Sequence, residues 1–279
     1  MVTDSACSLP GQLVTQNALT VVPMWVNIGA ESRRDGELAL SEVVARLGEG
    51  LSTSGPAPGD VAAAAQEADR GDGVVVLTVS KRMSSSWESA RLAAKLLEEE
   101  RAVAVVDTGT AAGAEGLVVL EASRAAREGA TLEGVVAAAE QAARGVRLLA
   151  TLPSLQHLAM SGRVPGAAAW GAKWLGLNPV FEFKFGKVSP LPPARSARLA
   201  YKRILATFAR DYERAAGRGA AVHVAALHSM DQAVAEELLV AAKAVIGAEP
   251  AAAFVGAFSS VMVAHTGPGL VGLAWWLGI

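Results

Sequence analysis

The stretch VVVLTVSKRMSSSWESARLAAKLL, residues 74–97, decides the fold. An apolar run over 74–79 ends in the polar segment 80–86, and an amphipathic pattern starts at Trp87. A short valine-rich run predicts a buried strand, and apolar residues recurring every three or four positions predict a helix. A strand, a loop and a helix in this order form the repeating unit of α/β proteins.

The same alternation recurs along most of the chain. Apolar runs at 19–28, 73–79, 102–107, 221–227 and 252–258 predict strands. Helical patterns fall between them, most of them bounded by Ser, Thr, Asp or Gly, at 41–50, 86–100, 114–129, 131–145, 198–217 and 230–247. We therefore predict an α/β fold with a mostly parallel sheet in its N-terminal part.

The alternation breaks between Thr151 and Arg195, a segment rich in glycine and proline. Within it, VFEFKFGKV (180–188) alternates strictly and predicts an antiparallel hairpin. Trp170 and Trp174 share a helix face there and line a tunnel or pack in the core. We read the segment as a crossover between two sub-domains, residues 1–150 and 151–279.

Composition excludes several classes of protein. The 279 residues are 52% hydrophobic with a net charge of -2, which argues against a protein that binds nucleic acid by neutralising phosphates. The apolar run 251–264 is interrupted by glycine and serine and falls short of the roughly 20 residues of a spanning helix. The N-terminus lacks the pattern of a signal peptide. Cys7 is the single cysteine and is expected to be buried, and no metal-ligand spacing occurs. These features predict a cytoplasmic protein.

The loop 80–86 is a candidate anion site. A loop after a parallel strand lies at the edge where α/β proteins bind ligands, and the next helix begins with free N–H groups. Ser85 and Glu88 fit a capping box, which leaves Ser80 and Ser84 for a ligand. Alternatively, all four serines satisfy loop backbone, and Lys81 and Arg82 are solvated.

Three further loops have a similar character. Residues 52–60 carry small hydroxyls before a helical run in which Pro58 fits an early position. Residues 264–269 place His265 in a glycine-rich loop where backbone can approach a ligand. Residues 161–165 carry Arg163, which is solvent-exposed or reaches an anion between the sub-domains.

Taken in order, these segments resemble the DegV family of bacterial fatty-acid-binding proteins. The resemblance is carried by residues 3–5 with Leu9-Pro10, 53–57, 80–90, 107–108, 161–163, Arg195 and 265–269, where HTGPG matches the family's HxGPG in full. It spans nearly the whole chain.

The resemblance implies two α/β sub-domains with a long-chain fatty acid held between them. It implies that Thr53 and Ser84 bind the carboxylate, and that Arg163, Arg195 and His265 surround the headgroup or serve a kinase step. Ser54, Ser85 and Gly267 belong to the same ligand-binding loops. The implied role is a carrier without a cofactor that presents the fatty acid to a separate fatty acid kinase, which forms an acyl phosphate. Transient membrane contact stays open.

This chain departs from the family pattern at several positions. Ser85 stands where the family has glycine, Ser86 where it has threonine, and Gly55 and Ala57 replace glutamine and serine. Ser161 replaces the first glycine of the family's GGR. Only Met1-Val2 precede the Thr3-Asp4-Ser5 segment, so we expect either that the first strand is cut short or that the start codon was placed late and a few more apolar residues precede it.

Other functions compete with the carrier. Ser84 and His265 could pair in a serine hydrolase, although no G-x-S-x-G elbow is present. A lipid sensor without a kinase would use the same pocket. The glycines at 109, 113 and 116 lack the spacing of a dinucleotide-binding turn.

Overall fold

The structure is a computed structural model that describes residues 1–164, 166–174, 176–216 and 219–278. Pro165 and Gly217, which end the predicted 161–165 loop and 198–217 helix, lie outside the described residues. Within the described residues, no helix is both long and apolar enough to cross a membrane.

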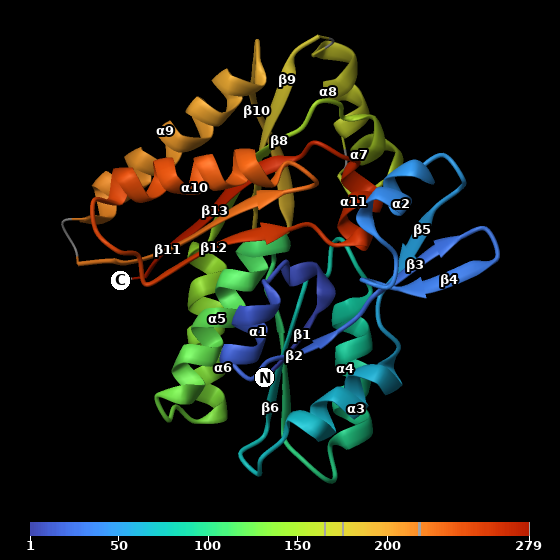
Figure 1. Cartoon of the computed structure of the whole chain (residues 1–279). Coiled ribbons are helices and arrows are strands. Elements are labelled where there is room, and N and C mark those ends of the chain that lie inside the picture. Colours follow the sequence, from blue (N-terminus) through green and yellow to red (C-terminus); the bar gives the residue numbers. More distant parts are fainter. Residues whose placement is uncertain (165, 175, 217–218, 279) are drawn as a thin grey trace.

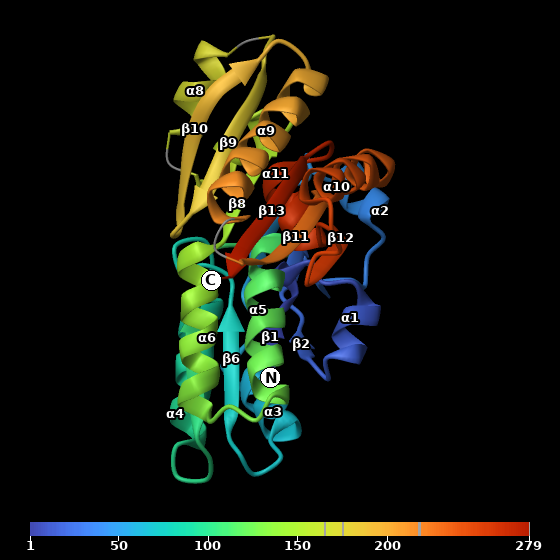
Figure 2. The same ribbon diagram turned by 90° about the vertical axis from the view of Figure 1, so that its left-hand side faces the viewer.

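A parallel sheet forms the N-terminal part (Figures 1 and 2). Its strand order is β2-β1-β6-β7, and all neighbouring strands run parallel. The strands are β1 (Val2–Asp4), β2 (Thr20–Val22), β6 (Val74–Thr78) and β7 (Val103–Asp107). A short first strand is thus present. The predicted run 19–28 divides between β2 and β3 (Trp25–Ile28), and β3 belongs to another sheet.

Helices cover both faces of this sheet, with α3 (Pro58–Ala68) and α4 (Ser86–Leu97) on one face and α5 (Ala112–Arg127) and α6 (Leu132–Gly145) on the other (Figure 1). Val74 and Val76 pack with α3 and α4, while Val75 and Leu77 join the α5–α6 side. Successive side chains of a strand point to opposite faces, which explains why the opening run is apolar throughout.

The C-terminal sheet is mixed, with the order β10-β9-β8-β13-β11-β12. Only β11 (Ala221–His228) and β12 (Ala252–Ala257) pair in parallel, and the other neighbours are antiparallel. The remaining strands are β8 (Arg147–Thr151), β9 (Asn178–Lys184), β10 (Lys187–Ala194) and β13 (Val271–Gly278). The predicted hairpin is confirmed as β9–β10.

Helices α9 (Ala197–Ala216) and α10 (Gln232–Ile246) pack on one face of this sheet. The opposite face turns toward α5, which lies between the two sheets (Figure 2). At Gly113 a Cβ atom would stand 2.5 Å from Leu227 Cδ2, so the absence of a side chain permits this close approach. One core cluster therefore joins both predicted sub-domains, and their boundary at residue 150, inside β8, stays a prediction.

The remaining elements lie at the junction of the two sheets or on the surface. A small antiparallel sheet has the order β4-β3-β5. Trp170 and Trp174 pack together, with ring centroids 6.2 Å apart, against the shared core. Cys7 is buried, as predicted. The elements are the 3-10 helix η1 (Ser5–Cys7), α1 (Gly11–Gln16), β4 (Glu31–Arg34), α2 (Leu40–Ala45), β5 (Ser52–Ser54), α7 (Gln156–Met160), α8 (Ala167–Lys173) and α11 (Ser260–Thr266).

One expectation about the last loop is wrong. His265 and Thr266 form the final turn of α11, and the loop itself begins at Gly267. The apolar residues before His265 are helical because one face of α11 packs into the shared core through Val261 and Val263.

Candidate ligand-binding site

A cavity of about 540 Å³ lies between the two sheets. Its wall is largely apolar, and most of its polar side chains come from the predicted loops. The apolar residues include Ala6, Met24, Val79, Leu148, Ala150, Leu158, Phe181, Phe183, Val188, Phe258, Val261, Met262 and Leu270. The polar residues are Thr53, Ser54, Lys81, Arg82, Ser84, Ser85, Arg163, His265 and Thr266. An apolar cavity with a few convergent polar groups is the usual form of a small-molecule site.

Thr53 and His265 meet at this cavity from opposite ends of the chain. Thr53 lies in β5, and its Oγ1 is 2.7 Å from Nε2 of His265. The hydrogen bond joins residues 212 positions apart, so it ties the N-terminal part to the C-terminal part.

His265 is held in its neutral form. Burial, with a smaller contribution from the Arg163 guanidinium, lowers the pKa of His265 to about 4. At neutral pH the imidazole therefore carries one proton, and it can donate or accept toward Thr53 depending on its tautomer.

The serine loop turns tightly before α4. The N–H groups of Met83 and Ser84 both donate to the Ser80 carbonyl, at 2.8 and 3.3 Å. Ser84 Oγ accepts from the Ser86 N–H at 3.2 Å and lies 2.9 Å from Ser86 Oγ. Ser84 thus presents its hydroxyl to the cavity beside the first turn of a 12-residue helix.

The predicted capping box is wrong. Ser85 does precede α4, but its side chain makes no capping hydrogen bond, and Ser84 satisfies the Ser86 N–H instead. Glu88 turns outward to Arg91, with 3.4 Å between Oε2 and Nη1. Because Ser85 has φ -77° and ψ 0° rather than the extended backbone usual at this position, its side chain does not reach the helix N–H groups.

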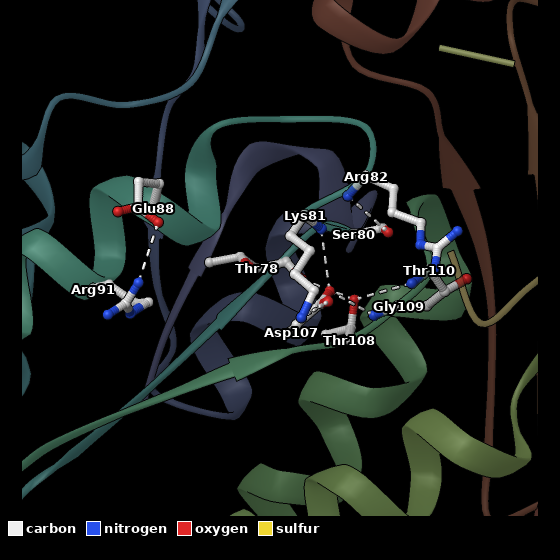
Figure 3. A network of polar contacts seen from close by, with 10 residues as sticks. All are labelled: Thr78, Ser80, Lys81, Arg82, Glu88, Arg91, Asp107, Thr108, Gly109 and Thr110. Carbon is white, nitrogen blue, oxygen red and sulfur yellow. Dashed lines mark hydrogen bonds and ion pairs between the residues drawn. The ribbon is translucent and has the colours of Figure 1, made fainter. Parts of the chain in front are cut away.

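A second strand-end loop supports the serine loop (Figure 3). Asp107 Oδ1 accepts from the N–H groups of Lys81 and Gly109, at 3.2 and 2.9 Å. The Thr108 hydroxyl donates to the Thr78 carbonyl at 2.8 Å. These bonds link the ends of β6 and β7 and fix where the serine loop starts. Lys81 is exposed as expected, although its ammonium lies 3.7 Å from Asp107 Oδ2.

Gly55 lets the two hydroxyl loops approach one another. A Cβ atom at Gly55 would stand 2.8 Å from Ser85 Oγ and 3.0 Å from the Ser86 nitrogen. The Ser85 side chain therefore occupies the space beside Gly55. Ser85 and Gly55, which both depart from the family pattern, are thus neighbours in the structure.

The structure brings most of the predicted site residues together. Thr53, Ser54, Ser84, Ser85, Arg163 and His265 all line the cavity. Gly267 instead packs on His157, whose Cδ2 would lie 2.5 Å from a Cβ atom added there. Arg195 is exposed between β10 and α9 and is not among the lining residues. The roles assigned to these residues stay predictions.

Sequence reasoning missed a buried acidic pair behind the serine loop. Asp4 Oδ1 accepts from the Ala6 N–H and Oδ2 from the Val79 N–H, both at 3.0 Å. Burial raises the pKa of both carboxyls, and the charge of Asp4 adds to the shift of Glu115, whose pKa lies well above its usual value. Its Oε1 accepts from the Thr3 hydroxyl at 3.3 Å. Asp4 was visible in the Thr3-Asp4-Ser5 segment, whereas Glu115 reads as an ordinary surface residue of a helix.

The cavity wall formed by Phe181, Phe183 and Val188 was also missed. Phe181 and Phe183 alternate in the predicted hairpin, a pattern that indicates one buried face. The pattern does not tell what that face covers.

Comparisons with known proteins agree on one family. The model of the DegV family, described as an uncharacterised protein family, matches residues 1–277. A DegV domain-containing protein of Streptomyces coelicolor is 32% identical over 278 residues, 98% of this chain and 96% of the relative.

Solved structures are similar over the whole chain. A DegV family protein from Thermus thermophilus, described for its fatty acid binding, is 33% identical with a TM-score of 0.85, covering 99% of this chain and 98% of the other. A stearic-acid-binding protein from Eubacterium ventriosum, 24% identical, also has a TM-score of 0.85 over 99% of this chain and 97% of the other, and shows the shared fold alone. With a family model that spans almost its full length, this chain belongs to the DegV family.

Proposed function

We propose that this protein binds a long-chain fatty acid, with the carboxylate at Thr53 and Ser84 and the acyl chain in the apolar part of the cavity. The observation that carries the proposal is that the cavity is largely apolar and is also lined by two loops with hydroxyl side chains and by a neutral histidine. The fatty acids described for relatives of this fold support it.

Burial of the acyl chain supplies the gain in free energy. A chain of about 16 carbons gains roughly 0.8 kcal/mol per methylene, on the order of 10 kcal/mol before other costs. Removing the carboxylate from water costs several kcal/mol unless it accepts hydrogen bonds. The hydroxyls of Thr53 and Ser84 and the N-terminal end of α4 offset that cost.

The hydrogen-bond partners leave both hydroxyls able to donate. If neutral His265 carries its proton on Nε2, it donates to Thr53 Oγ1, and the Thr53 proton is free for the carboxylate. Ser84 Oγ accepts from the Ser86 N–H, and the Ser86 hydroxyl beside it also hydrogen-bonds buried Asp4. When the carboxylate is bound, Ser84 therefore gives its proton to the ligand rather than to Ser86. Each donor is thus oriented by a protein group behind it.

The protein acts as a carrier that presents the fatty acid to a separate kinase, which phosphorylates the carboxylate. Arg163 at the cavity and exposed Arg195 support that step. In an assay with a partner kinase, Arg163→Ala and Arg195→Ala are expected to bind lipid nearly as wild type but to support turnover poorly. If both variants sustain wild-type turnover, this assignment is wrong. Wild-type protein that binds fatty acid without supporting any partner kinase acts as a lipid sensor instead.

A serine hydrolase is the competing function. In a catalytic triad the base accepts from the nucleophile and a carboxylate orients it. Here Nε2 of His265 is engaged by Thr53, and the neighbouring charge is the Arg163 guanidinium, which makes the imidazole less basic. A fluorophosphonate probe is expected to leave Ser84 unlabelled, and labelling at Ser84 would favour the hydrolase.

The binding proposal is tested by calorimetric titration with palmitate and, as the matched ligand, hexadecanol. Both ligands bury the same chain, so the difference in Kd reports the carboxylate contacts. Palmitate is expected to bind at least ~10-fold more tightly, since a hydrogen bond to a charged group contributes about 1.5–3 kcal/mol. Equal affinities would refute the proposed carboxylate site, and failure of both ligands to bind would refute the proposal that the cavity binds a long-chain lipid.

A further inference from the structure

Asp4 is a buried carboxyl that receives hydrogen bonds from several separate groups. Its Oδ1 accepts from the Ala6 N–H and its Oδ2 from the Val79 N–H, both at 3.0 Å. The side chains of Ser86 and Glu115 also hydrogen-bond this carboxyl. Asp4 is 2% exposed, so these groups replace the water that an exposed carboxylate would bind. An ionised carboxylate offers about four acceptor sites, and these partners fill them.

Asp4 holds both ends of the serine loop. Val79 is the residue before this loop, and Ser86 is the first residue of α4. One carboxylate on β1 therefore fixes where the chain leaves the sheet and where it enters the helix. Ser84 Oγ accepts from the Ser86 N–H at 3.2 Å and lies 2.9 Å from Ser86 Oγ. The hydroxyl proposed to meet the ligand is thus one residue away from this support.

Asp4 and Glu115 can share a hydrogen bond only when one of them carries a proton. Both are buried, with Glu115 at 0% exposure, and burial raises the pKa of each. Glu115 Oε1 accepts from the Thr3 hydroxyl, whereas no donor within the described residues reaches Oε2. A proton held between the two carboxyls gives Glu115 a second hydrogen bond and avoids two like charges in a buried site. This proton belongs to the pair rather than to either residue.

Among the described residues, the titratable groups that act most strongly on the pair are acidic or neutral. The negative charge of Asp107, at the end of β7, raises the pKa of Glu115 further. The buried Cys7 thiol on η1 has its own pKa raised well above the usual value by burial and by the charge of Glu115, so it stays neutral. The shared proton is therefore what lowers the pair from two negative charges to one.

We propose that Asp4 and Glu115 are positioning residues for the ligand carboxylate. Asp4 fixes the serine loop so that Ser84 donates to the ligand, and Glu115 shares the proton that lets the buried Asp4 stay in place. The proposal rests on the proposed function, since Ser84 needs this orientation only if a carboxylate binds beside it. Neither Asp4 nor Glu115 is among the described residues that line the cavity, so both act through Ser86 and Ser84.

Calorimetric titration with palmitate and hexadecanol separates a role at the headgroup from a general role in the fold. In Asp4→Asn an amide donor faces a backbone N–H, so the start of the serine loop shifts. The Kd for palmitate is expected to rise at least ~10-fold, and the Kd for hexadecanol by less than about threefold. The change of charge alone would act in the opposite direction, because removing a nearby anion favours a bound carboxylate. Tighter palmitate binding by Asp4→Asn, or equal weakening of both ligands, would overturn the proposal.

Two variants at Glu115 test the shared proton. Glu115→Met is similar in size but has no donor, and it is expected to raise the Kd for palmitate about fivefold. Glu115→Gln keeps a donor for Asp4 and an acceptor for Thr3, so it is expected to avoid most of this loss. If both variants bind palmitate equally, the donor at this position does not matter and the proposal is wrong.

Infrared spectroscopy detects the proton itself. At neutral pH the carbonyl band of a protonated, buried carboxyl is expected in wild type and is expected to be lost from Glu115→Gln. Identical spectra of the two proteins in this region would contradict a shared proton.

Glu121 supplies the matched control. It lies on the same helix, is 5% exposed, and pairs with Arg124 rather than with Asp4. Glu121→Gln is expected to retain wild-type affinity for palmitate and the infrared band, whatever its effect on the thermal midpoint. If Glu121→Gln weakens palmitate binding as much as Glu115→Met does, the effect at Glu115 comes from general stability and the positioning role is refuted.

Hydrogen exchange of the ligand-free protein keeps this proposal distinct from fatty acid binding. Asp4→Asn and Glu115→Met are expected to lose protection at the amides of residues 79–86, while the C-terminal sheet keeps wild-type protection. Unchanged protection of residues 79–86 in both variants would overturn the proposal whether or not palmitate binds. If palmitate and hexadecanol fail to bind wild type while this loss of protection is seen, the proposed function fails alone. If Asp4→Asn does not fold, Glu115→Met compared with Glu115→Gln decides the outcome by the same measurements.

Discussion

Replacing Thr53 with valine tests the carboxylate site because valine keeps the volume and removes only the hydroxyl. In Thr53→Val the fatty acid loses one donor, and Nε2 of half-buried His265 loses its 2.7 Å partner. Loss of a hydrogen bond to a charged group costs about 1.5–3 kcal/mol, which corresponds to a roughly 10- to 150-fold rise in Kd for palmitate. The Kd for hexadecanol should rise much less, since its headgroup is uncharged.

The chain offers a matched control in Thr266. Its side chain also lines the cavity, but its hydroxyl donates to the backbone carbonyls of Met262 and Gly267, both at 3.1 Å. Thr266→Val is therefore expected to change the Kd for palmitate by less than about threefold, although it costs about 1 kcal/mol of folding stability. Calorimetric titration measures both variants, and thermal unfolding checks that each is folded. If Thr53→Val binds palmitate as wild type does, or if both variants weaken it equally, Thr53 does not hold the carboxylate.

Three other predictions follow from the same geometry. Ser84→Ala should raise the Kd for palmitate by roughly tenfold or more in the same titration. Ser85→Ala removes no capping hydrogen bond and should leave thermal stability unchanged. An unchanged Kd in Ser84→Ala, or a loss of thermal stability in Ser85→Ala, would contradict the roles given to these serines. Gly55→Ala should weaken palmitate binding, because the new Cβ would stand 2.8 Å from Ser85 Oγ. Adding Ser85→Gly to this variant removes that oxygen and should restore part of the affinity. If the double variant binds palmitate no better than Gly55→Ala, the clash is not with Ser85. The pKa of His265 is about 4 in the folded protein against 6.5 unfolded, so the unfolded state binds more protons between these pH values. As pH falls from 6.5 to 4, the free energy of unfolding of wild type should therefore drop by about 3 kcal/mol relative to that of His265→Gln, as measured by urea unfolding at each pH. A difference between the two proteins that does not vary with pH would mean that His265 is not held neutral.

Local patterns predicted the units from which the fold is built. The apolar run of β6 and the helix after it could be recognised because a strand buried on both faces has no polar alternation. The predicted early position of Pro58 is confirmed, since it is the first residue of α3, where its missing N–H costs nothing. The rule that ligands lie beyond the carboxyl ends of parallel strands located the serine loop at the cavity wall.

What could not be predicted depends on contacts between distant segments. Strand β13 inserts antiparallel between β8 and β11, and no local pattern specifies that register. The pairing of Thr53 with His265 depends on how the two sheets face one another. Glu115 is buried because α5 lies between both sheets, although its sequence shows the polarity of a surface helix. The choice of Ser84 over Ser85 at the start of α4 depends on one backbone angle in the loop.

The central claim is that the cavity between the two sheets holds one fatty acid. Native mass spectrometry of protein purified from a bacterial host, followed by denaturing extraction of lipid, tests it most directly. The account predicts one bound long-chain fatty acid per chain, which Thr53→Val retains only partly and Thr266→Val retains in full. Protein that emerges empty, and that also fails to take up added palmitate, would contradict the claim.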